Sequence, residues 1–249
     1  MKKFIAIFVA VLTLGLAAQA TAYFEEGHLI RVVYDKNGGG VEVATDLGEM
    51  RTWTTPGVSP SNVIVGDGES AWDLSMFPGR SLNDLVVEYY AIVYGTYDAW
   101  TSGPFTGQIS GNRKFTGFNS AAGITRVYYN TLVPTGSRVV GAESHLQSHY
   151  TMFGKVGLSI GGFNDFIYPQ YNGEENLGVL STQGYVDQVL YFYNVPNSVG
   201  TGVPVAILRT MADGSTIINP GQPVVPVPAS ILLLGSGLLG LIGVRRKNS

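Results

Sequence analysis

Leu85-Val-Val-Glu-Tyr-Tyr-Ala-Ile-Val-Tyr94 is a run of ten residues in which only Glu88 is charged and the other nine are apolar or aromatic. Valine, isoleucine and tyrosine are enriched in strands. A strand with one face in water alternates polar and apolar residues, whereas a strand covered on both faces has a nearly continuous apolar sequence. The run therefore predicts a strand that is buried on both of its faces.

The residues that precede this run predict a hairpin. His28 to Tyr34 alternates, with Leu29, Arg31 and Val33 on one side of the predicted strand. Asp35-Lys-Asn-Gly-Gly-Gly40 then turns the chain into a second short strand, residues 41–44. The stretch from position 35 to position 46 superficially resembles a calcium-binding EF-hand loop. It lacks the expected ligand type at Gly39 and is flanked by predicted strands, so the hairpin turn is the better interpretation.

The C-terminal half carries similar signals. Gly184 to Val195, with Val-Leu-Tyr-Phe-Tyr at its centre, predicts another strand. A late hairpin joins Val205 to Met211 and Ser215 to Ile218 through Ala212-Asp213-Gly214, the strongest short hairpin signal in the chain. Further strand candidates are Val63 to Val65, Gly123 to Asn130, Ser137 to Gly141 and Val156 to Ile160.

Turn residues recur every 8 to 15 positions, and only Ala142 to Phe153 has a pattern suggesting a helix. Strands at this spacing are typical of sandwiches rather than of alternating strands and helices. All-β units of roughly 200 residues are commonly single domains. The predicted fold class is therefore all-β, a single jelly-roll-like β-sandwich over residues 23–218.

The N-terminus has the three parts of a secretory signal peptide. Met1-Lys2-Lys3 is positively charged, Phe4 to Ala18 is apolar apart from Thr13, and Ala-x-Ala cleavage sites end at Ala20 and Ala22. A membrane-spanning helix needs about 20 apolar residues, more than this run supplies. Residues 1–22 are thus predicted to be a signal peptide.

The C-terminus has a different apolar segment. Residues 219–228 contain four prolines and predict a semi-rigid extended spacer. The run from Ala229 to Val244 then has 16 apolar or small residues, which as a helix would span about 24 Å of a hydrocarbon core of about 30 Å. Basic residues after it would keep the tail cytoplasmic. Residues 229–249 are predicted to be a single, short transmembrane sorting helix with a basic end.

This tail resembles the sorting tail of PEP-CTERM proteins. The resemblance covers about the last 25 residues and rests on Gly235 to Leu241 together with three sorting-motif residues and three basic stop residues: Pro226, Val227 and Pro228, then Arg245, Arg246 and Lys247. Val227 stands where the family's name places a glutamate. The resemblance implies export through the Sec machinery, processing by an exosortase-type enzyme between Pro226 and Ala229, and transient membrane contact. It also implies delivery to the envelope, surface or extracellular matrix of a biofilm-forming bacterium.

Composition limits the possible functions. The chain has no cysteine, so disulfides, cysteine nucleophiles and cysteine metal sites are excluded. Five of its 15 Lys and Arg residues lie in the two end segments and all 18 acidic residues lie between them, which leaves ten basic against 18 acidic residues in the body, a net charge of −8. An acidic body argues against nucleic acid as a partner, because phosphates are bound by clustered Lys and Arg.

Catalytic motifs are present but lack their usual context. Gly157-Leu-Ser159-Ile-Gly161 matches a nucleophile elbow, yet the residues that follow do not predict a helix, and the three histidines (His28, His145 and His149) all precede Ser159. Gly235 to Gly240 matches a dinucleotide fingerprint inside the apolar tail, where close helix packing explains it better. No catalytic or cofactor-binding residue is predicted from these motifs.

Metal ligands are equally sparse. On a helix, His145 and His149 would share a face with Glu143 nearby, but no further ligand stands at a telling spacing, so no metal site is predicted. The acidic stretches Asp67-Gly-Glu69 and Gly173-Glu-Glu-Asn176 leave Ca²⁺ as an alternative, since carboxylate and carbonyl oxygens bind it. The prediction is no cofactor.

Two clusters of aromatic residues have two possible roles: Tyr89, Tyr90, Tyr94, Tyr97 and Trp100, and then Tyr168, Tyr171, Tyr185, Tyr191 and Tyr193. Exposed aromatic rings can stack on sugars, but aromatic residues are also good strand and core residues, and the core role is favoured. If any aromatic faces a ligand, we expect it to be Trp53, Trp72 or Trp100.

Two function classes remain. The first hypothesis is a non-enzymatic exported protein with a structural, adhesive or glycan-binding role and exopolysaccharide as a possible partner. The alternative is a secreted polysaccharide hydrolase, which needs two carboxylates about 5 to 10 Å apart in an open cleft. Its candidate residues are Asp67, Glu69, Glu88, Asp165, Glu174 and Glu175.

Overall fold

The computed structural model describes residues 24–54, 60–96, 98–104, 110–112, 115–154, 173–193 and 199–221. By its contacts the chain divides into two units, residues 1–219 and 220–249, and every helix and strand given below belongs to the first unit. The predicted signal peptide, most of the spacer and the sorting helix lie outside the described residues, so their boundaries stay predictions. Within the described ranges, no helix is long and apolar enough to cross a membrane.

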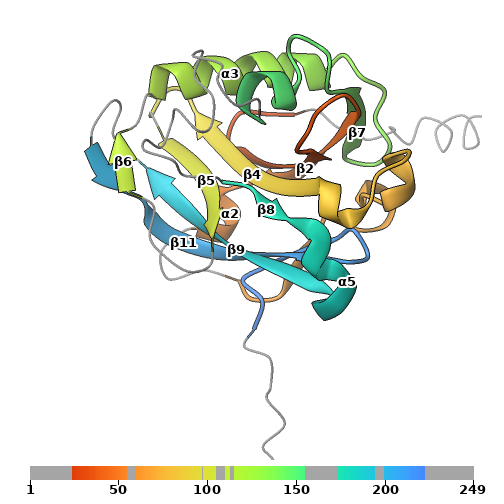
Figure 1. Ribbon diagram of the computed structural model, residues 1–249. Coiled ribbons are helices and arrows are strands. Elements are labelled where there is room, and N and C mark those ends of the chain that lie inside the picture. Colours follow the sequence, from red (N-terminus) through yellow and green to blue (C-terminus); the bar gives the residue numbers. More distant parts are fainter. Residues whose placement is uncertain are drawn as a thin grey trace, which may run out of the picture. The chain divides into compact units, whose positions relative to one another are not determined.

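Within the described residues, ten strands form one antiparallel sheet in the order β3-β12-β11-β9-β5-β4-β1-β2-β7, with β8 also paired to β4. Figure 1 labels several of these strands, among them β2, β4, β5, β9 and β11. Their bounds are β1 His28–Asp35, β2 Val41–Glu49, β3 Val63–Val65, β4 Leu85–Val93, β5 Asp98–Pro104, β7 Arg138–Ala142, β8 Glu175–Asn176, β9 Tyr185–Tyr193, β11 Val203–Met211 and β12 Thr216–Ile218. A separate two-stranded sheet pairs β6 (Ser110–Asn112) with β10 (Val199–Thr201).

Among the described residues, helices are few and mostly short. The longest is α3, Phe115–Tyr129, which lies over one face of the sheet together with the π-helix η4, Tyr150–Gly154 (Figure 1). The others are α2 Arg51–Thr54 and α5 Leu180–Gln183, and the 3-10 turns η1 Gly68–Ser70, η2 Leu74–Met76, η3 Leu82–Asp84 and η5 Leu177–Val179.

β4 is buried on both faces, as its sequence predicts, because only Val93 at its end is partly exposed. Val86, Tyr90 and Ile92 point into a core on the side of α3 and η4, which we call the helix-side core; Phe118 of α3 and Phe153 of η4 belong to it. Leu85, Val87, Tyr89 and Ala91 of β4 point into the inner core on the opposite face. The inner core includes Leu29, Val33, Trp53, Trp72, Phe77, Leu85, Val87, Tyr89, Trp100 and Leu208.

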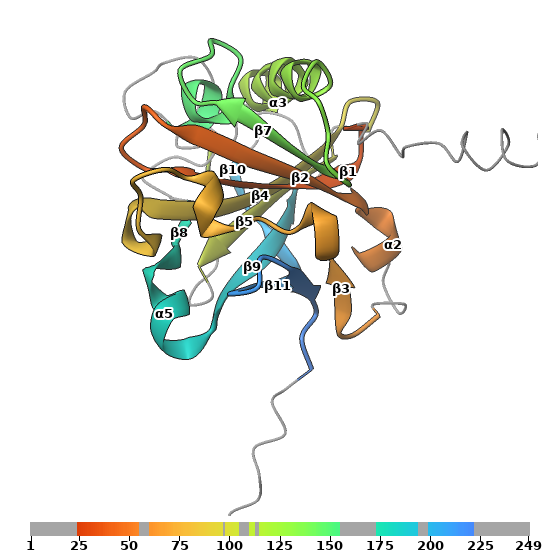
Figure 2. The same cartoon turned by 90° about the vertical axis from the view of Figure 1, so that its right-hand side faces the viewer.

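The sheet curls around its inner core into a half-barrel (Figure 2). Arg31 on β1 is fully buried, and its Nη1 donates a hydrogen bond to Thr216 Oγ1 on β12 at 2.9 Å. Tyr89 on β4 also reaches β12, with its hydroxyl 2.8 Å from the same threonine oxygen. β12 lies five places from β1 in the strand order, so side chains can link the two only if the sheet bends back on itself.

Much of the strand pattern is confirmed. The first hairpin forms as β1 and β2, and the late one as β11 and β12 with Asp213-Gly214 in its turn. The predicted strands at Val63 to Val65, Ser137 to Gly141 and Gly184 to Val195 correspond to β3, β7 and β9 within one or two residues at each end. Val156 to Ile160 lies outside the described residues.

Three expectations differ from the structure. The jelly-roll-like sandwich is replaced by one curled sheet, because the inner face packs against itself instead of against a second sheet. Gly123 to Asn130, predicted as a strand, is the second half of α3, whose buried residues Phe118, Ala121, Ala122 and Tyr129 recur at helical spacing. Ala142 to Phe153, the predicted helix, begins as the end of β7 and continues through turns, with only η4 at its end helical.

Candidate functional site

A pocket of about 330 Å³ opens where α2 meets the strands β5, β9 and β11. We call it the aromatic pocket; it is lined by Arg51, Thr54, Asp98, Trp100, Phe192, Val203 and Val205. Known ligand pockets of about 300 to 1,000 Å³ combine apolar walls with a few placed polar groups. The aromatic pocket has this composition.

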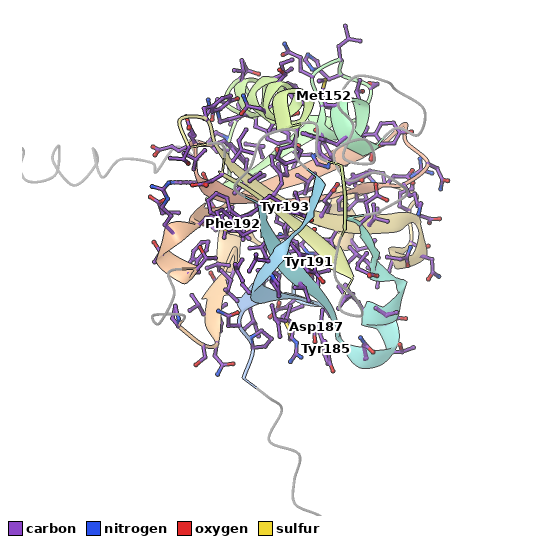
Figure 3. All side chains as sticks on the ribbon, turned by 90° about the vertical axis from the view of Figure 1, so that its left-hand side faces the viewer. Met152, Tyr185, Asp187, Tyr191, Phe192 and Tyr193 are labelled. Carbon is purple, nitrogen blue, oxygen red and sulfur yellow. The ribbon has the colours of Figure 1, made fainter. Side chains whose placement is uncertain are left out.

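Its apolar wall is built by three neighbouring strands. Trp100 on β5 lies directly opposite Phe192 on β9, and their ring centroids are 5.0 Å apart with an interplanar angle of 36°. Figure 3 labels Phe192 together with its neighbours Tyr191 and Tyr193 on β9. Val203 on β11 is paired with Phe192 in turn and is 56% exposed. Cross-strand aromatic and β-branched pairs stabilise a sheet and fix the ring positions. The wall is therefore a preformed apolar surface, with Trp100 beneath it and Phe192 and Val203 closer to solvent.

The polar side of the pocket is an ion pair. Arg51 begins α2 directly after β2, and its Nη2 lies 3.3 Å from Asp98 Oδ2 at the start of β5. The arginine side chain is 55% exposed, whereas the aspartate is nearly buried and also accepts a hydrogen bond from Thr96 Oγ1 at 2.5 Å. A guanidinium supplies only donors and a carboxylate only acceptors. A ligand in the pocket thus meets both kinds of polar group opposite an apolar wall.

A second group of interest is buried in the helix-side core, on the opposite side of β4. Glu88 Oε2 lies 2.8 Å from His149 Nε2, and both side chains are 0% exposed. The hydroxyl of Tyr34 donates to Glu88 Oε2 at 3.5 Å and also to Glu174, which precedes β8. Two carboxyl groups and an imidazole are therefore gathered around one phenol.

Glu42 on β2 completes this buried cluster. Its carboxylate accepts hydrogen bonds from the backbone N–H groups of His149 at 2.8 Å and Tyr150 at 2.9 Å, and from the Tyr129 hydroxyl at 3.0 Å. We call Tyr34, Glu42, Glu88, Tyr129, His149 and Glu174 the acid cluster. Its members come from β1, β2, β4, α3, the segment before η4 and the segment before β8.

Burial sets the protonation of the cluster. Loss of water around the charged form raises the pKa of Glu88 well above its usual range and lowers the pKa of His149 to about 4. Burial also raises the pKa of Glu42, although His149 and three hydrogen bonds act in the opposite direction. At mildly acidic pH, the Glu88–His149 pair therefore holds one proton and no net charge.

Several polar atoms of this region lack a hydrogen-bond partner among the described residues. They are Glu88 Oε1, His149 Nδ1 and the Tyr90 hydroxyl, all fully buried on the same face of the sheet. Rings surround the imidazole: Tyr34 at 5.3 Å, Tyr90 at 5.4 Å and Phe153 at 4.8 Å between centroids. The pair is held in an apolar setting that disfavours charge.

The six acids predicted for a hydrolase do not all lie in one place. Asp67 and Glu69 are exposed beside and in η1, and Asp165 lies outside the described residues. Glu88 and Glu174 do converge, on the Tyr34 hydroxyl, while Glu175 belongs to β8. Because Glu88 has no exposed surface, a polymer has no access to this pair in the present conformation.

The candidate metal ligands point in different directions. His145 is exposed and stacks on Tyr128 at 4.0 Å, while His149 is buried against Glu88. Glu143 accepts hydrogen bonds from the backbone N–H groups of Asp35 and Gly40, each at 2.7 Å. Over the described ranges, which include both acidic stretches considered for Ca²⁺, no three His, Asp or Glu residues are arranged to hold a metal ion.

The other predicted site residues are mostly structural. Tyr89, Tyr90, Tyr191 and Tyr193 are core residues, as favoured. Trp53 and Trp72 are buried in the inner core, so of the three tryptophans only Trp100 lines the aromatic pocket. His28 is half-buried, and its Nδ1 lies 2.9 Å from Asp46 Oδ2. Tyr97, Tyr168, Tyr171 and Ser159 lie outside the described residues.

Sequence reasoning missed half of the acid cluster. No motif in the sequence includes Tyr34, Glu42 or Tyr129 as a candidate site residue. One signal was available: Glu88 is the only charged residue in a run predicted to be buried on both faces, and a charge there requires a buried partner. Its partner, His149, was identified only as a possible metal ligand.

Comparison with known families identifies the C-terminal segment. Residues 224–247 match the PEP-CTERM protein-sorting motif, a span that contains both the Pro226 to Pro228 motif and the basic residues Arg245 to Lys247. The motif indicates an exported protein of the bacterial cell envelope that is sorted by an exosortase-type enzyme. Comparisons with curated proteins and with solved structures found no match.

Proposed function

We propose that this exosortase-sorted protein is a non-enzymatic glycan-binding protein of the cell surface or extracellular matrix, and that the aromatic pocket is its binding site. The observation that carries the proposal is the pairing of an apolar wall, Phe192 and Val203 over Trp100, with the Arg51–Asp98 ion pair. Delivery to the envelope brings such a pocket to the place where polysaccharide is abundant.

The chemistry of a sugar ring suits these two sides. A pyranose has an apolar C–H face, which packs on an aromatic ring, and a rim of hydroxyl groups, which both donate and accept hydrogen bonds. Arg51 would donate to the hydroxyl groups and Asp98 would accept from them. The net charge of −8 on the body opposes a polyanion, so we propose an uncharged sugar unit as the ligand.

Binding can be measured by calorimetry, with the mature protein and neutral polysaccharide from the producing bacterium. Phe192→Ala removes the more exposed ring of the wall, and we expect at least a tenfold loss of affinity, equivalent to about 1.4 kcal/mol. Tyr185→Ala is the matched control, because it removes a ring from the other end of the same strand. Unchanged affinity for Phe192→Ala, or equal losses for the two variants, would contradict the assignment of the pocket.

Cleavage of the C-terminal tail can be tested separately from glycan binding. We propose cleavage within Pro226 to Ala229 after export by the Sec machinery, with residues 229–244 in the membrane only until cleavage. The intact mass of protein recovered from the cell surface and from the medium tests this. A chain that ends near Pro228 supports processing, whereas one that retains Arg245 to Ser249 indicates a lasting membrane anchor.

A polysaccharide hydrolase is the second candidate function, and one observation favours it. Glu88 and Glu174 both contact the Tyr34 hydroxyl, and retaining glycosidases use two closely spaced carboxyl groups, one of them with a raised pKa. The burial of Glu88 weighs against it. Release of new reducing ends from the polysaccharide, lost in Glu88→Gln, would establish the hydrolase and refute the non-enzymatic proposal.

A further inference from the structure

Residues 143–154 follow β7 and include η4. Buried carboxyl groups attach this segment to the sheet. We call it the clasp. Glu42 binds two of its backbone N–H groups, Glu88 binds the imidazole of His149, and Glu143 of the clasp binds backbone N–H groups of Asp35 and Gly40 in the turn between β1 and β2. Phe153 adds an apolar anchor in the helix-side core. Most of the polar contacts that hold the clasp on the sheet are therefore made by carboxyl groups that are buried away from water.

We propose that Glu88 and His149 act as a proton-sharing latch, which holds the clasp on the sheet in mildly acidic to neutral surroundings and releases it as the pH rises above neutrality. The geometry that carries the proposal is a carboxyl group and an imidazole at 2.8 Å, both without exposed surface, in a region crowded with other acids. This inference does not depend on glycan binding.

Among the residues that the structure describes, no Lys or Arg side chain forms an ion pair with Glu88. The titratable groups that face it come from every element packed around it: Tyr34 from β1, Glu42 from β2, Tyr90 from β4, Tyr129 from α3, Tyr150 from the clasp and Glu174 from the stretch before β8. α3 also carries Arg126, which lies over the ring of Tyr94, 5.6 Å from its centre. When the shared proton leaves, Glu88 becomes a buried anion beside two further carboxyl groups, and such an uncompensated charge is strongly destabilising.

The direction of the pH effect follows from counting protons. In an open or unfolded chain, Glu88 loses its proton near pH 4.5 and His149 near pH 6.5. In the closed clasp the pKa of Glu88 is raised and that of His149 is lowered to about 4, so the pair keeps one proton throughout this interval. Both states then hold one proton between pH 4.5 and 6.5, and the pair contributes no pH dependence there.

Outside that interval the two states differ. Above pH 6.5 the open pair holds no proton, whereas the closed pair keeps one until the pH reaches the raised pKa of Glu88, so rising pH favours opening up to that point. Between pH 4.5 and about pH 4 the open pair gains its second proton before the closed pair does, so acid also favours opening, as expected for His149 with its lowered pKa; below about pH 4 both states hold two protons. On the alkaline side the opening equilibrium should increase by up to tenfold per pH unit, because one proton is released.

Amide hydrogen exchange of the mature protein between pH 6 and 9 tests the latch. After correction for the intrinsic pH dependence of exchange, we expect the opening equilibrium of residues 143–154 to rise by nearly tenfold per unit above pH 6.5. Glu88→Gln keeps a hydrogen-bond donor for His149 Nε2 but has no proton to lose, so this slope should disappear. Glu69→Gln, an exposed carboxylate, is the matched control and should behave as the unchanged protein.

A flat profile in the unchanged protein, or a slope that persists in Glu88→Gln, would overturn the proposal. A second measurement needs no variant: nitrogen NMR of the His149 ring. We expect an imidazole that stays neutral from pH 6.5 down to about pH 4 while the clasp is closed. An imidazole that titrates near its ordinary pKa of 6.5 would show that the pair does not share a proton as described.

Discussion

At the residue scale, Arg31 is an unusual feature of the inner core. Its guanidinium is fully buried and donates hydrogen bonds to neutral oxygens of described residues, the hydroxyls of Thr216 and Thr45 and the carbonyls of Gly66 and Ser70. Burial lowers the pKa of Arg31, while the neighbouring Tyr89 acts in the opposite direction. Through its hydrogen bond to Thr216, Arg31 links β1 to β12, a strand five places away in the sheet.

Replacing this residue should weaken the closure of the half-barrel. Arg31→Met removes the N–H groups that donate to the hydroxyls of Thr45 and Thr216, and we expect a loss of about 3 kcal/mol in the free energy of unfolding. Urea unfolding of Arg209→Met provides the comparison, because that arginine forms a more exposed ion pair with Asp187 and should cost about 1 kcal/mol or less. Equal urea midpoints for the two variants would argue against a closing role for Arg31.

At the scale of elements, the β11–β12 hairpin depends on one glycine. Gly214 has φ +84°, and a Cβ atom there would stand 1.9 Å from the carbonyl oxygen of Trp72. Gly39, in the β1–β2 turn, has a similar φ of +88° but open space around it. Gly214→Ala should therefore cost more than Gly39→Ala, for which backbone strain of about 1 kcal/mol is expected. Thermal unfolding of both variants measures the difference, and similar melting temperatures would contradict the close approach to Trp72.

The same elements show what the sequence could predict. The Asp213-Gly214 turn and the apolar run of β4 were readable because their signals are local. The helix α3 was not, because glycine, threonine and tyrosine give it weak helix propensity, and its packing on the helix-side core outweighs that propensity. In the aromatic pocket, Trp100 was a predicted candidate, whereas Arg51 and Val203 come from α2 and β11 and meet it only through the folded sheet.

At the scale of the whole folded unit, sequence patterns could not separate a sandwich from a curled sheet. Both require strands with apolar residues facing an interior, and the pattern along each strand is the same. What distinguishes them is pairing between strands far apart in the sequence, such as β5 with β9 and β1 with β4, and the hydrogen bond from β1 to β12 through Arg31. The acid cluster likewise draws its members from positions 34 to 174, a separation that no local motif spans.

The net charge of the body predicts how salt affects both stability and binding. A body with a net charge of −8 repels itself, and salt screens that repulsion over about 8 Å at physiological ionic strength. Raising the salt concentration from 10 mM to 150 mM should therefore raise the urea midpoint of the mature protein. Affinity for an uncharged polysaccharide should change little, because the polar side of the aromatic pocket is an internally neutralised ion pair, Arg51 with Asp98. Calorimetric titration at both salt concentrations distinguishes the ligand classes: binding that strengthens severalfold with salt would identify an anionic polymer and contradict a neutral sugar as the ligand.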